Sequence, residues 1–141
     1  YGAALLPAVF AQGGGVHHMN LPPLIALAAP VVIDAQRRLP ATVRAAAAQV
    51  PVCYEALPGP DLLAEGWEPD ILGMFVGHAH RGEFAEGSPL PPQILLFLEN
   101  IWDYAEGDER FFRDEVRVTY LHELGHYLGW DEEEIAQRGL D

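Results

Sequence analysis

The sequence predicts a single α+β domain, in which a small mixed sheet of three or four strands packs against one long helix and two or three others. Three observations favour this class. The length of 141 residues corresponds to one compact domain. Half of the residues are apolar, which is enough for one hydrophobic core. Short β-prone runs are interspersed with segments whose apolar residues recur at helical spacing.

Residues 1–18 differ from the rest of the chain. A small apolar stretch ends at Gln12, three glycines follow, and His17 and His18 precede Met19 as in a tag junction. We expect residues 1–18 to be a tag, a leader or a disordered extension, and residues 19–141 to form the domain. The expected location is the cytoplasm, or an exported location if the first residues are the remnant of a signal peptide.

Two helices and three strands are expected in the first two thirds of the domain. Apolar residues recur at helical spacing over Leu24–Leu39, and an alanine-rich stretch covers Ala41–Gln49 before Pro51. The longest apolar run, residues 21–33, is too short and too rich in proline to cross a membrane. The β-prone runs lie at residues 52–54, 71–76 and 93–98.

A long helix is predicted to begin after Asp108, the expected N-cap, and to end just before Gly129. Its apolar residues form two stripes, so most of this helix should be buried. Gly129 stands where a left-handed C-terminal cap is expected. Asp131 and Glu134 have the spacing of a capping box, which predicts a last short helix to Gln137.

Within the long helix the chain reads His122-Glu123-Leu124-Gly125-His126, which is the pattern H-E-x-x-H. Four residues make about one helical turn, so the two imidazoles lie on one face and can share a zinc ion. Glu123 is turned by about 100° and can take a proton from a zinc-bound water, which makes it the candidate general base. Composition predicts about 0.02 such matches by chance in a chain of this length. The alternative is a pair of core histidines held by hydrogen bonds.

A catalytic zinc ion needs a third protein ligand and an open fourth position. Glu132 lies six residues after His126, beyond the turn at Gly129, and completes the string H-E-x-x-H-x-x-G-x-x-E. We expect Glu132 to be the third ligand, with Asp131 as the leading substitute. Alternatively, Glu132 is an acid that stabilises the first turn of the last helix.

This spacing resembles the metzincin form of the zincin metallopeptidases, in which a histidine occupies the position of Glu132. Only nine residues follow Glu132, too few for the methionine turn of that clan. Over about residues 34–141 the chain resembles instead the small bacterial zincin-like family of minimal zinc metallopeptidases, in which the motif H-E-x-x-H-x-x-G-x-x-(Asp/Glu) ends the chain. The resemblance implies a minimal zincin-like fold, bound zinc, and a hydrolase whose partner is a peptide or protein substrate.

In zincins generally, an edge strand beside the metal binds extended peptide by strand addition. By this resemblance Gln93–Leu98 is the candidate edge strand; alternatively, it is a core strand. His78 and His80 lie in the loop of about sixteen residues before it, and both would face one side of an extended segment. They could line the cleft or stabilise the oxyanion, although loop histidines more often have no such role.

Net charge argues against a nucleic-acid partner. The formal charge is −13 at pH 7, and all eight basic residues are arginine, so the chain repels phosphate. The charge is uneven, because residues 99–141 hold 13 acids and four arginines. This surplus around the proposed metal site would attract cations and favour basic peptides as substrates.

Two other function classes stay open. One is a metal-dependent endoribonuclease that resembles the small bacterial rRNA-maturation family, whose pattern H-x-x-x-H-x-x-G-x-x-H has the same spacing. Glu123, Glu132 and the acidic charge all count against it. The other is a non-catalytic, metal-stabilised binding module. The sequence indicates neither the cleavage specificity nor the oligomeric state.

Overall fold

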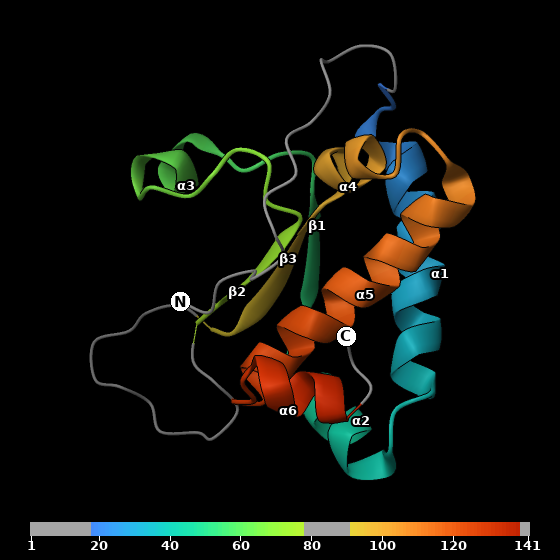
Figure 1. Ribbon diagram of the computed structural model, residues 1–141, viewed down its shortest axis with the longest axis vertical. Helices are drawn as coiled ribbons and strands as arrows, with labels where there is room; N and C mark the ends of the chain where they lie inside the picture. Colours follow the sequence, from blue (N-terminus) through green and yellow to red (C-terminus); the bar gives the residue numbers. More distant parts are fainter. Residues whose placement is uncertain (1–17, 78–90, 139–141) are drawn as a thin grey trace.

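The computed structural model describes residues 18–77 and 91–138. It confirms the α+β class, with a three-stranded mixed sheet packed against helices (Figure 1). In chain order, the elements are α1 (Leu21–Arg37), α2 (Ala41–Ala47), β1 (Val52–Glu55), α3 (Pro60–Ala64), β2 (Gly73–Val76), β3 (Gln93–Phe97), α4 (Leu98–Tyr104), α5 (Glu109–Tyr127) and α6 (Glu132–Gln137).

The strands lie in the order β1-β3-β2. β1 runs parallel to β3, with Val52 opposite Ile94, and β2 runs antiparallel to β3, with Gly73 opposite Leu96. The expectation that Gln93–Leu98 forms an edge strand is therefore wrong, because β3 pairs on both sides and has no free edge for a peptide. Among the described strands, β2 forms the edge that packs against α5.

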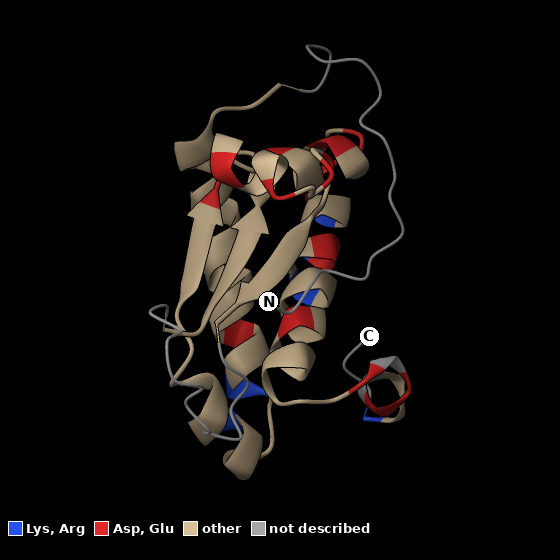
Figure 2. Ribbon diagram, turned by 90° about the vertical axis from the view of Figure 1, so that its left-hand side faces the viewer, with Lys and Arg blue, Asp and Glu red and all other residues tan. Residues whose placement is uncertain are grey.

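The sheet is almost free of charge, as Figure 2 shows. Glu55, at the end of β1, is the one charged residue in the three strands of the described chain. Strands with so few polar residues are typical of a sheet that is covered on both faces. The charged residues are left to the helices and loops.

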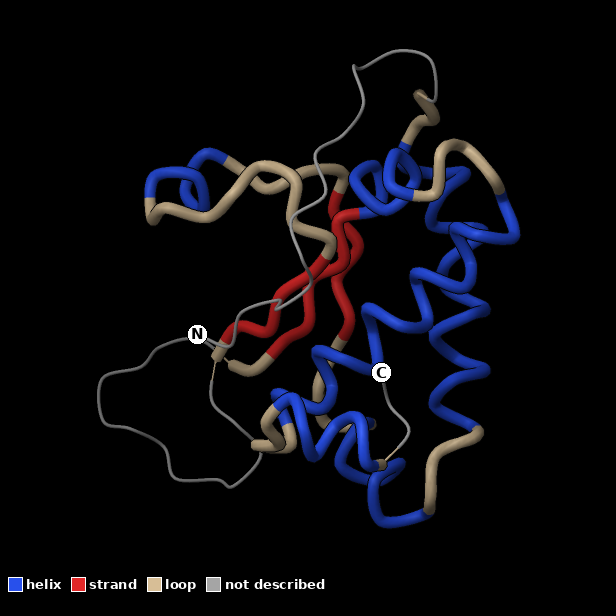
Figure 3. The backbone as a smooth tube through the Cα atoms, viewed as in Figure 1, coloured by secondary structure: helices blue, strands red, loops and turns tan. Residues whose placement is uncertain are grey.

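Helices α1, α4 and α5 pack together over one face of the sheet (Figure 3). α1 begins with Pro22 and Pro23, whose missing N–H groups cost nothing in the first turn of a helix. Its buried residues include Leu24, Ala28 and Val32, spaced by four, which form the stripe that faces the core. Through this stripe α1 packs against α5 and α4.

The opposite face of the sheet has a smaller core of its own. Met74, Val76 and Phe97 are buried there, and Leu62 of α3 and Trp67 pack against them. This cluster holds β2 and β3 between two apolar layers. None of the helices in the described ranges is long and apolar enough to span a membrane.

Two helices, α3 and α4, lie outside the sequence-based expectation. α4 follows β3 without a loop, so Leu98 begins a helix rather than ending a strand, and Phe97 is the N-cap. Leu98, Ile101 and Trp102 are buried at spacings of three and four, as on one helical face. With seven residues, α4 is too short for that periodicity to stand out in the sequence.

Candidate metal centre

Helix α5 carries the H-E-x-x-H motif and is capped at both ends. The Asp108 carboxylate accepts a hydrogen bond of 2.8 Å from the N–H three residues further on. At the other end, Gly129 has a φ of 82°, its N–H donates to the His126 carbonyl at 2.9 Å, and the Trp130 N–H donates to the Gly125 carbonyl at 3.0 Å. These two bonds make a Schellman motif. They end the helix directly after the second histidine and set the direction in which the chain continues.

The imidazoles of His122 and His126 meet on one face of α5. Their Nε2 atoms are 3.3 Å apart, and their ring planes lie at 77° to each other. Two nitrogens that each bind one tetrahedral zinc ion at about 2.0–2.1 Å are about 3.3 Å from each other. The pair therefore has the spacing that a shared zinc ion requires, from a donor type that zinc prefers.

Glu123 lies on a different side of the helix and is buried more deeply. Its exposed fraction is 0%, and that of His122 is 4%. The rotation of about 100° per residue turns Glu123 away from the His face and further into the molecule. A buried carboxylate that directly follows a candidate metal ligand in the helix is a suitable group to exchange a proton away from bulk water.

Two acids that follow helix α5, Glu132 and Asp131, are the candidates for the third ligand. Within the described residues, no group of three or more metal-ligating side chains comes together. Asp131, the substitute expected from sequence, is exposed and caps α6: its carboxylate accepts a 2.8 Å hydrogen bond from the Glu134 N–H. Glu132 is the first residue of α6, and its side chain lies outside the described part. Asp131 thus uses one of its two carboxylate oxygens in the helix cap.

The short connection from α5 to α6 is held by side chains as well as by its backbone. The guanidinium carbon of Arg138 lies 4.3 Å from the centre of the Trp130 ring, a cation–π contact. Trp130 also packs against the main core. The position of Glu132 relative to the histidines therefore depends on the Schellman turn and on the capping box of α6.

Beyond the motif, the structure describes His18 and Tyr120, whereas His78 and His80 lie outside the described residues. His18 is exposed and lies 3.3 Å from the Asn20 side chain, well before the motif in the chain. Tyr120 is buried, and its hydroxyl accepts a hydrogen bond of 3.1 Å from the Gln36 side chain on α1. That contact gives Tyr120 a packing role between α1 and α5.

A close approach of β2 to α5, next to the motif, was missed at the sequence level. A Cβ atom placed on Gly73 would lie 2.7 Å from Cγ2 of Thr119, so only glycine fits at this contact without movement. Thr119 is buried one helical turn before His122. Further along the two elements, the rings of Phe75 and Tyr127 pack edge to face, with their centres 5.6 Å apart. The glycine inside a β-prone run was the available signal, since such a glycine often marks close backbone approach.

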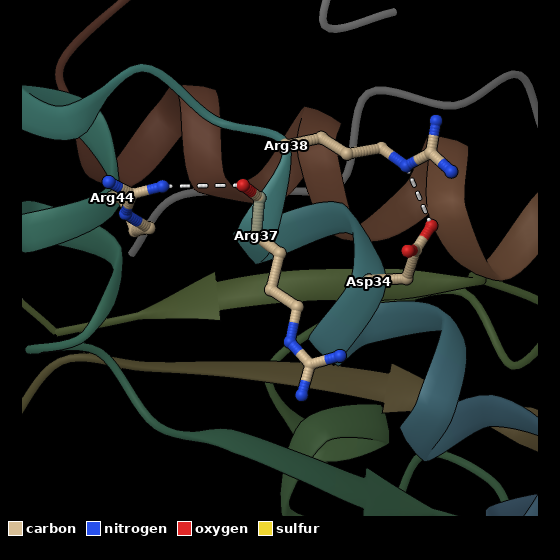
Figure 4. Close-up of polar contacts among 4 residues, drawn as sticks. All are labelled: Asp34, Arg37, Arg38 and Arg44. Carbon is tan, nitrogen blue, oxygen red and sulfur yellow. Dashed lines mark hydrogen bonds and ion pairs between the residues drawn. The ribbon is translucent and has the colours of Figure 1, made fainter.

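The arginines at the corner of α1 and α2 do not converge on one site. Arg38 pairs with Asp34 at 2.9 Å, and Arg44 donates to the backbone carbonyl of Arg37 at 3.3 Å (Figure 4). Figure 4 shows the three guanidinium groups pointing in different directions. A phosphate-binding surface requires several cations directed at the same region. This corner therefore does not supply the missing basic surface for RNA.

Comparison with known families gives a match over most of the described chain. Residues 47–140, two thirds of the chain, match a family model described as zincin-like metallopeptidase. The match extends from the end of α2 through all three strands to α6, and so includes the motif and Glu132. No curated protein matches the chain.

Proposed function

The chain belongs to the zincin-like metallopeptidase family, and from this premise we propose that it is a zinc-dependent peptidase. In this proposal His122, His126 and Glu132 hold the zinc ion, and Glu123 is the general base. The observation that carries the proposal is the distance of 3.3 Å between the two Nε2 atoms, which matches two ligands of one zinc ion. Family membership supports a metal and a protein substrate.

The donor set suits a catalytic rather than a structural metal. Two imidazoles and one carboxylate leave a fourth position of a tetrahedral site for water or substrate. When bound, zinc would polarise the scissile carbonyl and lower the pKa of the water that attacks it. The ligand side chains orient the site, because His122 is fixed in a buried helix and Glu132 starts the next one.

Glu123 would perform the proton transfers. It accepts a proton from the attacking water and then donates it to the amine of the leaving peptide. Complete burial keeps its carboxylate out of exchange with bulk water. Because it follows His122 directly in the helix, any movement of the metal ligand also moves the base.

Replacing Glu123 with glutamine tests the proposal. Glu123→Gln should lower peptide hydrolysis by about 100- to 10,000-fold, the usual contribution of a general base, while zinc content stays the same. The matched control is Glu109→Gln, the same chemical change at an exposed position in the first turn of α5. Cleavage would be followed with a peptide library and zinc by elemental analysis. Hydrolysis that survives Glu123→Gln would rule out this role for Glu123.

A further inference from the structure

The face of α5 that carries the histidines also carries a second acid, Glu115. Residues 115, 119, 122 and 126 follow one another at spacings of three and four, so they share one side of the helix. Glu115 precedes His122 by seven residues, which is about 10 Å along the helix axis. Thr119 lies between them, in contact with Gly73 at the start of β2. β2 therefore begins beside α5 between Glu115 and the metal centre and continues along the helix towards Tyr127.

Glu115 is partly buried, and the described parts of the chain supply no counterion for it. None of the described residues forms a hydrogen bond or an ion pair with its carboxylate. Its neighbours three and four positions away on α5 are uncharged: Phe111, Phe112, Val118 and Thr119. Burial, and secondly the charge of Asp114, raise the pKa of Glu115. A carboxylate in these surroundings is stabilised by any cation that reaches it.

The surroundings of Glu115 also suit the apolar part of a long basic side chain. The ring of Phe111 is 50% exposed, and Val118 is partly exposed on the same flank of α5. Lysine and arginine bury their methylene stems on such apolar surface and keep the charged end at a polar group. An apolar flank that ends at a carboxylate has the two parts needed to bind one of them.

We infer that Glu115 is a specificity-determining residue, which binds a lysine or arginine of the substrate about three residues from the cleaved bond. This inference rests on the proposed peptidase function. The position follows from distance, since an extended peptide advances about 3.3 Å per residue and Glu115 lies about 10 Å from His122. The substrate class is a peptide or protein segment with a basic residue at that spacing.

General attraction by the acidic chain has to be separated from this local contact. Long-range attraction is screened beyond about 8 Å at physiological salt and does not depend on the position of the basic residue in the peptide. Asp114 provides the control, because it lines a groove on the α1 side of α5 together with Arg113 and Arg117. Asp114→Asn removes the same charge as Glu115→Gln, on a different side of the helix.

The first experiment uses peptides in which one lysine, or the uncharged norleucine, occupies each position in turn around the cleaved bond. The wild type should prefer lysine about three residues from the cleaved bond, measured as the kcat/KM of the lysine peptide divided by that of the norleucine peptide. We expect Glu115→Gln to lower this ratio by about three- to tenfold, the effect of a partly exposed charge pair, and Asp114→Asn to change it less than twofold. An unchanged ratio in Glu115→Gln, or an equal loss in both variants, would overturn the inference.

A binding experiment separates this inference from the proposed function. In the Glu123→Gln background, labelled lysine and norleucine peptides are compared by fluorescence anisotropy, with and without Glu115→Gln. A lysine preference that depends on Glu115, without cleavage by the wild type, would support the binding role of Glu115 and overturn the peptidase proposal. Cleavage without such a preference would support the peptidase proposal and overturn the inference about Glu115. If the peptides are neither bound nor cleaved, both are overturned.

Discussion

Replacing Gly129 with alanine should weaken zinc binding by about 5- to 30-fold. Gly129 holds the Schellman turn between α5 and α6 with a φ of 82°, a conformation that glycine adopts freely. An alanine there costs about 1–2 kcal/mol. The chain can relieve that strain by unwinding the turn, but Glu132 would then leave the position beside the histidines that we propose for it. Zinc must restore the turn to regain its third ligand, and 1–2 kcal/mol corresponds to about 5- to 30-fold in affinity.

The control for this variant is Gly66→Ala. Gly66 also has a positive φ, 98°, and a Cβ there would meet no atom within 4 Å, so its strain is of the same kind without a clash. Both variants should lower the melting temperature of the metal-free protein by about 3–8 °C. Only Gly129→Ala should also weaken zinc, measured by competition with a chromophoric chelator. Equal zinc affinities in the two folded variants would refute the claim that this turn positions a ligand.

Two further predictions concern folding. Gly73→Ala places a Cβ 2.7 Å from Thr119 Cγ2 and 2.9 Å from the Leu95 carbonyl, so it should destabilise the protein by about 1–3 kcal/mol in urea unfolding; an unchanged midpoint would mean that β2 and α5 lie further apart. Burial raises the pKa of Tyr54 to about 12. The raised pKa contributes to the free energy of unfolding in full below about pH 10, and this contribution should be lost as the pH rises towards 12. Tyr54→Phe should make the fall in unfolding free energy above pH 10 less steep, whereas identical slopes would contradict it.

Features determined by nearby residues could be predicted from the sequence. The N-cap at Asp108, the left-handed glycine at position 129 and the capping box of Asp131 and Glu134 depend on contacts within five residues, and the structure has all three. The shared face of His122 and His126 depends only on the helical repeat. Local rules therefore accounted for α5 and for the histidine half of the site.

Features that depend on distant pairing could not be predicted in the same way. Hydrophobic pattern marks β3 as a strand but does not say that β1 and β2 flank it, so its central place appeared only in the structure. The contact of Gly73 with Thr119 joins residues far apart in the chain and has no periodic signature. Even the burial of Glu123 needed the assembled fold, because a charged residue in a helix is normally assigned to its exposed side.

Three of the acids in the α5 region, Asp108, Glu115 and Glu123, show how rotation about one helix separates chemical roles. Asp108 precedes the first turn, where its carboxylate has unpaired N–H groups to bind. Eight residues separate Glu115 from Glu123, a net rotation of about 80°, and over that rotation the side chain passes from partial exposure to 0% exposure. An acid at the first angle lies on the same side of the helix as the imidazoles, and one at the second is enclosed in the core. A single inserted residue between them would turn Glu115 by about 100° relative to the metal centre, so the length of α5 is itself a requirement of the proposed site.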